Sequence, residues 1–188
     1  MTATNKKVED LILIKPKKFF DKRGFFSEVY NKRSYIQYGV NEVFQQDNHS
    51  FSNYAWTVRG LHYQSPPHAQ GKLVRCGRGS IFDVAVDLRK GSPTYAQWVG
   101  YELSAVNGYQ VYIPPGFAHG FLTLEPESEI IYKCTDYYAP ETEGSLRWND
   151  PELGIKWPIE GETILSDKDA QAPLLRDLDS PFEWSMFR

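Results

Sequence analysis

The chain has 188 residues, of which 41% are hydrophobic and 15% aromatic. This length and composition predict one globular domain over residues 1–188 and exclude a disordered linker, which would be poor in aromatic residues. The formal charge of −3 arises from 21 basic and 24 acidic residues. Such a mixed balance argues against a nucleic-acid-binding or membrane-surface protein and favours a small-molecule partner.

Nothing in the sequence predicts insertion into a membrane or export. Residues 1–10 are polar and lack an apolar stretch, so no secretory signal or transit peptide is expected and the cytoplasm is the expected location. The longest stretch without a full charge, residues 106–124, contains two prolines and His119, which a membrane-spanning helix does not tolerate together. Cys76 and Cys134 are too few for a disulfide framework, so we expect reduced, buried thiols.

The predicted elements begin, in chain order, with a short helix over Lys32–Tyr38. Apolar runs with a period of two then predict short strands, separated by turns rich in glycine and proline. These strands cover Lys72–Cys76, Ser80–Arg89, Trp98–Leu103, Tyr109–Ile113 and Glu129–Tyr137. A second short helix could form over Asp167–Leu175, although Pro173 interrupts it. Many short strands with few helices predict an all-β sandwich or barrel.

The alternation places two polar side chains among apolar neighbours. Lys72 shares a strand face with Val74, and Tyr132 shares one with Ile130 and Cys134. A lysine among apolar residues is costly unless it has a partner or a function, so one interpretation is that both side chains line a ligand pocket. The other is a register shifted by one residue, with both side chains in water. The periodicity leaves both open.

Two of the four histidines, His62 and His119, lie in segments dense in glycine and aromatic residues. Neither has a second histidine two or four residues away, so we expect no metal site. The sequence also lacks the G-x-S-x-G motif of many hydrolases, a P-loop and a G-x-G-x-x-G dinucleotide motif. Residues 77–79 fit a β-turn better than part of a phosphate loop.

The chemistry that these residue types still allow is proton transfer. It requires a histidine base oriented by a carboxylate, a lysine near developing negative charge, and a tyrosine that supplies a proton. Arg23, Arg59 and Arg75 are candidates for binding phosphate. Arg75 lies on the strand face opposite Lys72, and for it we favour a surface position.

Seven segments together resemble the dTDP-4-dehydrorhamnose 3,5-epimerase family. They occur in the same order from about residue 9 to residue 175, which makes the resemblance specific for the superfamily and less so for the reaction. The segments are DKRGFFSE (residues 21–28), QDNHS (46–50), RGLHYQ (59–64), QGKLVR (70–75), FDVAVD (82–87), IPPGFAHGF (113–121) and LSDKD (165–169).

The resemblance implies a cupin-type jelly roll with short flanking helices, a homodimer, and no metal or other cofactor. The implied substrate is a nucleotide-linked 4-keto-6-deoxy sugar, and the implied pathway is dTDP-rhamnose biosynthesis, which supplies lipopolysaccharide. Matched motif by motif, His62 resembles the base and Asp169 its carboxylate partner. Lys72 resembles the group that stabilises the enolate, and Tyr132 the acid.

The resemblance also implies a set of substrate-binding positions. These are Arg23, Glu28, Gln46, Asp47, Asn48, Arg59, His119, Glu143 and Lys168, together with Tyr138, which falls where a side chain stacks on the thymine. By the same analogy, Arg23 and Glu28 would reach the active site of the partner subunit.

The chain departs from the family pattern at two positions, because Trp56 and Ala96 stand where glycine is usual. Trp56 could reshape the mouth of the pocket, but we favour a surface or dimer-contact role for it. Two other functions remain open. One is an epimerase that inverts a single carbon, 3 or 5, of a related nucleotide-linked deoxy sugar. The other is a non-catalytic sugar-binding cupin.

Overall fold

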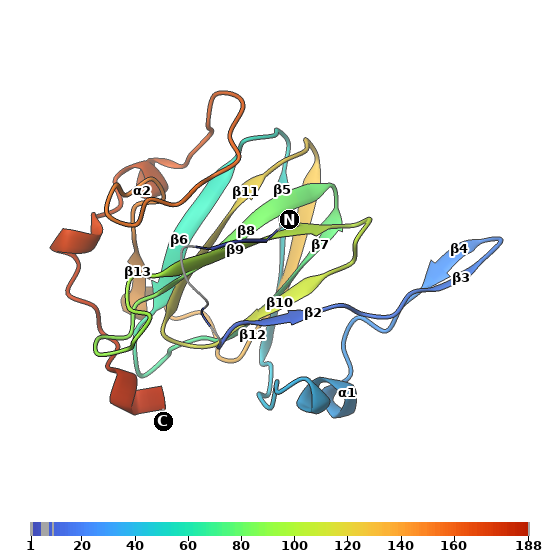
Figure 1. Ribbon diagram of the computed structural model, residues 1–188, viewed down its shortest axis with the longest axis horizontal. Helices are drawn as coiled ribbons and strands as arrows, with labels where there is room; N and C mark the ends of the chain where they lie inside the picture. The colour runs from blue at the N-terminus through green and yellow to red at the C-terminus, as the bar shows by residue number, and fades with distance from the viewer. Residues whose placement is uncertain (1, 5–7, 9, 188) are drawn as a thin grey trace.

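Two antiparallel β-sheets face each other and form the body of the protein (Figure 1). The computed structural model describes residues 2–4, 8 and 10–187. One sheet has the order β1-β9-β8-β11-β6-β13. Its strands are β1 (Thr2–Thr4), β6 (Val58–Gln64), β8 (Ser80–Asp87), β9 (Trp98–Ser104), β11 (Phe117–Thr123) and β13 (Glu143–Ser145).

The other sheet has the order β2-β10-β7-β12-β5. Its strands are β2 (Ile12–Ile14), β5 (Gln46–Ser52), β7 (Lys72–Arg78), β10 (Gln110–Ile113) and β12 (Ser128–Cys134). These two sheets, with few and short helices beside them, confirm the predicted all-β jelly roll of cupin type.

The helices are short and lie outside the sandwich. They are α1 (Lys32–Gln37), α2 (Asp167–Ala170) and the 3₁₀ helices η1 (Pro140–Thr142), η2 (Leu175–Asp177) and η3 (Trp184–Phe187). The predicted first helix is confirmed to within one residue; the Asn31 side chain caps it by accepting a hydrogen bond from the Arg33 amide at 3.0 Å. The predicted second helix begins at Asp167 but ends at Ala170, because Pro173 cannot continue it.

The predicted strands are found with small shifts at their ends. The strand predicted over 129–137 ends at Cys134, where the chain turns and Asp136 accepts a hydrogen bond from the Tyr137 amide. The strands of the two sheets that were not among the predictions are β1, β2, β5, β6, β11 and β13. Strand β11 is buried along its whole length and includes a glycine, so it lacks the alternation on which the prediction depended.

The apolar core lies between the two sheets, and it decides which way Lys72 and Tyr132 face. Val74, Cys76 and Ile130 belong to this core, with Val111 from the neighbouring strand β10 and Phe121 from β11 of the facing sheet. Because side chains two residues apart share a strand face, Lys72 and Tyr132 also face the interior. The interpretation that places them in a pocket is therefore correct. Cys76 and Cys134 are buried free thiols, as predicted.

The outer face of the six-stranded sheet carries a second core. Every residue of β8 is buried, because the C-terminal segment covers the face that the interior core does not. Phe182 and Leu153 pack there against Phe82 and Val84. In Figure 1 this segment, coloured orange to red, lies beside β6 and β13. This covering brings residues 164–173 close to the strand that carries His62.

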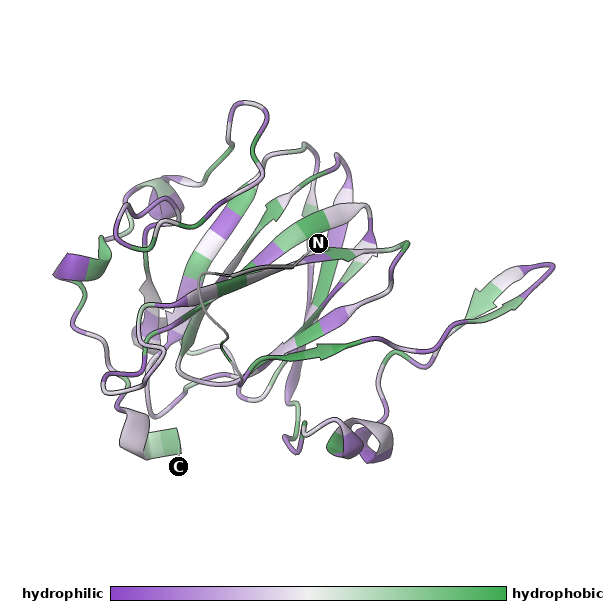
Figure 2. Cartoon of the chain, in the orientation of Figure 1, coloured by the Kyte–Doolittle hydropathy of each residue, from purple (hydrophilic) through white to green (hydrophobic). Residues whose placement is uncertain are grey.

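A two-stranded hairpin projects from the body (Figure 1). Its strands are β3 (Phe19–Asp21) and β4 (Gly24–Phe26), and all six residues are exposed. Four of them are phenylalanines, and Figure 2 shows the hydrophobic colouring of this hairpin away from the core. Within the part of the chain that the structure describes, no helix is long and apolar enough to cross a bilayer.

Candidate active site

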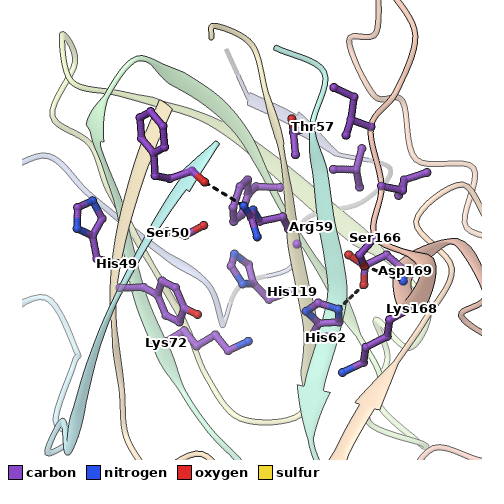
Figure 3. Close-up of a pocket in the computed structure, with 17 residues that line it drawn as sticks. His49, Ser50, Thr57, Arg59, His62, Lys72, His119, Ser166, Lys168 and Asp169 are labelled. Carbon is purple, nitrogen blue, oxygen red and sulfur yellow. Dashed lines mark hydrogen bonds and ion pairs between the residues drawn. The ribbon is translucent and has the colours of Figure 1, made fainter. Parts of the chain in front are cut away.

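A cavity of about 720 Å³ opens between the two sheets, and the four residues predicted for the chemistry line it. His62 comes from β6, Lys72 from β7, Tyr132 from β12 and Asp169 from α2. Figure 3 shows the labelled side chains gathered around this space. A second cavity of about 220 Å³ shares His62, Lys72 and Tyr132 with the first. The two spaces therefore meet at these three side chains.

A glycine contact sets the position of the two cavity histidines. Gly60 has a φ of +113°, and a Cβ atom there would lie 2.7 Å from the Gly120 Cα atom and from the His119 carbonyl oxygen. Only glycine allows strands β6 and β11 to approach this closely. The resulting register places His62 directly opposite His119. Both imidazoles consequently lie on the same wall of the cavity.

His62 and Asp169 form a hydrogen-bonded pair. The His62 Nε2 atom lies 2.6 Å from Asp169 Oδ1, and the Gly60 amide donates to the other carboxylate oxygen at 3.2 Å. Burial raises the pKa of Asp169, but its contacts with His62 outweigh this and hold the pKa below its usual value. An ionised carboxylate at this distance accepts a hydrogen bond from Nε2, which leaves Nδ1 as the ring nitrogen that can take up a proton.

Helix α2 holds Asp169 in place although it is only four residues long. The Ser166 side chain caps its first turn by accepting a hydrogen bond from the Asp169 amide at 3.1 Å. The chain before α2 is tied to the start of β6, where the Val58 amide donates to the Ile164 carbonyl oxygen. The carboxylate therefore reaches the base from a segment fixed to the same sheet.

Lys72 and Tyr132 approach from the opposite wall, which the five-stranded sheet forms. Burial lowers the pKa of Lys72, and the nearby acidic groups of Cys134, Asp83 and Glu143 oppose that shift. Burial raises the pKa of Tyr132, so its phenol is protonated at neutral pH. The cavity thus holds a proton acceptor on one wall, and a phenol and an amine on the other.

A second histidine–carboxylate pair lies beside the first. His119 Nε2 lies 2.8 Å from Asp83 Oδ2, and both side chains are buried. Burial lowers the pKa of His119, which favours the neutral imidazole. Asp83 was not among the predicted site residues. The available signal was a carboxylate within the otherwise apolar strand over residues 81–86.

Four predicted binding residues surround the smaller cavity: Gln46, Asn48, Tyr138 and Glu143. They contact one another. The Gln46 side-chain amide donates to Asn48 Oδ1 at 3.0 Å, and the Tyr138 hydroxyl donates to Glu143 Oε2 at 3.0 Å. Lys168, which lines the larger cavity, pairs with Glu143 at 2.6 Å. These residues come from β5, β13, α2 and the chain after β12.

Arg59 lines the larger cavity at its outer side. Its guanidinium donates to the Phe51 carbonyl oxygen at 3.0 Å and to Ser52 Oγ at 3.2 Å. These contacts hold the arginine against β5 and keep its positive charge at the cavity, where it can meet an anionic group. Arg75 faces away from this cavity, as its strand position predicts, and is half-buried rather than fully exposed.

Three predicted binding residues lie away from these cavities. Arg23 pairs with Asp21 on the projecting hairpin, and Glu28 accepts hydrogen bonds from Asn31 and Ser34. Asp47 points to the outside of β5, because it alternates with the inward-facing Gln46 and Asn48, and it pairs with Lys133. Their roles as substrate contacts stay predictions, which for Arg23 and Glu28 involve a second chain.

The two departures from the family pattern share a backbone conformation. Trp56 has a φ of 60° and Ala96 a φ of 59°, the left-handed region in which glycine is favoured. Trp56 is half-buried and packs on the outer core.

Among the residues that the structure describes, no group of three or more His, Cys, Asp or Glu side chains is arranged to hold a metal ion.

The chain is similar in sequence to known nucleotide-sugar epimerases. The profile of a family described as dTDP-4-dehydrorhamnose 3,5-epimerase matches residues 5–177. The enzyme of that name from Salmonella typhimurium is 53% identical over 169 residues, which cover 89% of this chain and 92% of the relative.

Solved structures agree with the sequence matches. A dTDP-6-deoxy-D-glucose-3,5-epimerase from Legionella pneumophila, in complex with dTDP-4-keto-L-rhamnose, has a TM-score of 0.88 and 48% identity, with 95% of each chain covered. A 3′-monoepimerase from Streptomyces bikiniensis, in complex with dTDP-quinovose, has a TM-score of 0.84 and 35% identity, with 91% of this chain and 86% of that chain covered.

Proposed function

The chain belongs to the dTDP-4-dehydrorhamnose 3,5-epimerase family, and from this membership we propose that its cavity converts dTDP-4-dehydro-6-deoxyglucose to dTDP-4-dehydrorhamnose. The protein is an isomerase that acts on a nucleotide-linked sugar in dTDP-rhamnose biosynthesis. Residues 1–188 act as one epimerase domain, and the reaction needs no cofactor or metal.

The reaction depends on the acidity of hydrogens next to a ketone. Removing a hydrogen from carbon 3 or carbon 5 leaves a carbanion that delocalises onto the carbon 4 ketone oxygen as an enolate. A positively charged donor aimed at this oxygen stabilises the enolate most in a site that excludes water. Lys72 supplies that donor from the cavity wall. Stabilising the ketone oxygen serves both carbons, since both lie next to the same ketone.

Inversion also requires that the proton leaves one face of the sugar ring and returns to the other. His62, paired with Asp169 at 2.6 Å, is the base. Tyr132 is the acid, because its phenol keeps its proton at neutral pH. The single observation that carries the proposal is that His62 and Tyr132 line one cavity from opposite sheets, and that Lys72 lines both cavities with them. A single base would tend to restore the starting configuration.

The remaining predicted residues bind the nucleotide. The exposed ring of Tyr138 at the smaller cavity stacks on the thymine, and Arg59 meets the diphosphate. The nucleotide also meets residues that line the two cavities: Gln46, Asn48 and Glu143 at the smaller one and Lys168 at the larger one. His119, in the larger cavity, lies beside the hexose. Asp47 is a weaker candidate, because it points away from both cavities.

Incubation with the 4-keto-6-deoxyglucose nucleotide in deuterated water tests the function. We expect deuterium at carbons 3 and 5, with both carbons inverted in the product. Label and inversion at one carbon alone would identify the second candidate, a single-carbon epimerase, which the likeness to a 3′-monoepimerase favours. Binding of the nucleotide sugar with no exchange at either carbon would instead indicate a sugar-binding protein without activity.

We also propose that the enzyme is a cytoplasmic homodimer that binds no nucleic acid. The projecting hairpin supports the dimer, since Phe20 and Phe26 are 74% and 71% exposed even though Phe20 packs on Phe25 within the hairpin. In a dimer, the hairpin of one chain would carry Arg23 and Glu28 to the cavity of the other.

A further inference from the structure

Tyr138 combines an exposed ring with two fixed ends. The residue is 56% exposed, yet its backbone amide donates to Gln46 Oε1 at 2.9 Å and its hydroxyl donates to Glu143 Oε2 at 3.0 Å. An exposed tyrosine ordinarily samples several side-chain orientations. Because this ring is tied at its backbone and at its hydroxyl, it is held in one orientation before any ligand arrives.

The acceptor of the Tyr138 hydroxyl is itself fixed. Glu143 lies on β13, in register with Gln64 of β6, and its Oε2 atom also accepts from Lys168 Nζ at 2.6 Å. Burial raises the pKa of Glu143, but the bonds from Lys168 and Tyr138 outweigh it and lower the pKa below its ordinary value. The carboxylate is therefore ionised at neutral pH and acts as a charged acceptor on a strand.

We propose that Glu143 is a positioning residue, which acts on the substrate through Tyr138 by holding the phenol ring as a platform for the nucleotide base. The inference rests on the proposed function and differs from the expectation that Glu143 contacts the substrate itself. The Tyr138 hydroxyl and the Lys168 ammonium meet at one oxygen of Glu143, Oε2. Fixing the ring in advance removes part of the cost of ordering it when the base binds.

Binding of dTDP to the ligand-free protein, measured by calorimetry, tests the assignment. Tyr138→Phe keeps the ring but removes the bond to Glu143, and we expect the dissociation constant to rise about threefold to tenfold. Glu143→Met removes the acceptor and should raise it by the same factor. The double variant should bind no more weakly than either single variant, because both changes break the same bond. Tyr138→Ala, which removes the ring, should lose about tenfold or more.

Glu143→Gln separates the two bonds that Glu143 makes. Its amide oxygen still accepts from the Tyr138 hydroxyl, while the ion pair with Lys168 is lost, so we expect a smaller loss of dTDP affinity than in Glu143→Met. Glu141→Met is the matched control, since this glutamate is exposed and lies two residues away. Inorganic diphosphate is the control ligand, and its affinity should change less than twofold in Tyr138→Phe and Tyr138→Ala, because it has no base and these two changes leave every charge in place.

Three results would overturn the assignment. The first is that the losses of dTDP affinity in Tyr138→Phe and Glu143→Met multiply in the double variant. The second is a loss of dTDP affinity in Glu143→Gln as large as in Glu143→Met. The third is a parallel loss of diphosphate affinity in the two Tyr138 variants. Failure of the unchanged protein to bind dTDP would also overturn it. A protein that binds dTDP with these coupled losses but turns over no keto-sugar would refute the proposed function and leave the assignment standing.

Discussion

At the scale of single residues, burial separates side chains of the same type. Each of the four histidines pairs with a carboxylate. The pairs are His49–Glu129, His62–Asp169, His68–Asp136 and His119–Asp83. The carboxylates of Glu129 and Asp136 are 32% exposed, whereas those of Asp169 and Asp83 are 5% and 2% exposed. Only the two nearly buried carboxylates form pairs shielded enough from water to orient a histidine inside the cavity.

The pair of His62 and Asp169 should show unequal losses when each partner is changed. We expect His62→Asn to lose about 10²- to 10⁴-fold in turnover, the usual contribution of a general base, together with hydrogen exchange at both carbons. Asp169→Asn should lose less, since it orients the imidazole and stabilises its charged form. Turnover and exchange in deuterated water measure both. Full hydrogen exchange in the His62→Asn variant would show that His62 is not the base.

Tyr132→Phe should separate proton removal from inversion. His62 and Lys72, the proposed base and enolate donor, are intact in this variant, so the carbon-bound hydrogens should still exchange with solvent while epimerisation slows. Nuclear magnetic resonance can follow label incorporation and product stereochemistry in one reaction. If the variant keeps full epimerisation, another group supplies the proton and the assignment of Tyr132 is wrong.

Lys72 should matter through its charge. Lys72→Ala is expected to lose about 10²- to 10³-fold in turnover, as when an oxyanion donor is deleted. Burial lowers the pKa of Lys72 from the 10.5 of an ordinary lysine. The charged form is needed, so activity should fall as the pH rises through the lowered pKa, and the alkaline limb should begin below pH 10.5. A near-normal rate in the variant would exclude Lys72 from the mechanism.

At the scale of elements, glycines and turns fix where the strands place their side chains. Gly60 allows β6 to approach β11, and this contact sets His62 opposite His119. In the turn between β8 and β9, by contrast, a residue other than glycine adopts a conformation that favours glycine. Ala96 there adopts a φ of 59° and bonds through its amide to the Asp87 carbonyl oxygen at 2.8 Å. A residue with a Cβ atom is strained in this conformation.

Ala96→Gly should therefore stabilise the protein. We expect the free energy of unfolding to rise by about 0.5–1 kcal/mol, because glycine adopts a positive φ without steric cost. Urea denaturation measures this change. Trp56→Gly is the contrasting variant: it relieves the same strain at φ 60° but removes a ring that packs on the outer core and contacts Gly161, so it should destabilise. A destabilised Ala96→Gly variant would show that this turn is not strained.

At the scale of the whole molecule, the hairpin is the feature that the single chain does not explain. Phe19, Phe20, Phe25 and Phe26 are each more than half exposed, and isolated two-stranded hairpins are marginally stable in water. A second copy of the chain would cover these rings. The same contact would account for Arg23 and Glu28, which lie far along the chain from the cavity residues and outside both cavities.

Replacing two of these rings should dissociate the proposed dimer. In Phe20→Ser/Phe26→Ser we expect the mass measured by light scattering to fall from about twice the chain mass of 21.7 kDa toward that mass. Turnover should fall with it, because Arg23 would no longer reach a partner's cavity. Val106→Ser is the control, as this valine is 89% exposed elsewhere on the surface. A monomeric unchanged protein, or a double variant that stays dimeric, would contradict this role of the hairpin.

The sequence by itself determined the local properties. Alternation predicted five strands and the shared faces of Lys72 and Tyr132, and seven ordered segments indicated the family, because both signals depend on neighbouring residues. The alternation could not predict β11, which is buried on both faces. It also could not say whether Lys72 pointed inward, since a period of two defines two faces without telling which one is enclosed.

Only the tertiary structure decided which distant residues meet. His62 and Asp169 are 107 positions apart, and Tyr138 shares one carboxylate oxygen of Glu143 with Lys168. These contacts depend on how the sheets pair and on where the C-terminal segment packs, which no local pattern encodes. The same packing buried Asp83 beside His119 and turned Asp47 outward. The sequence therefore indicated the candidate catalytic residues, whereas the side chains that contact them followed from the packing of the sheets and the C-terminal segment.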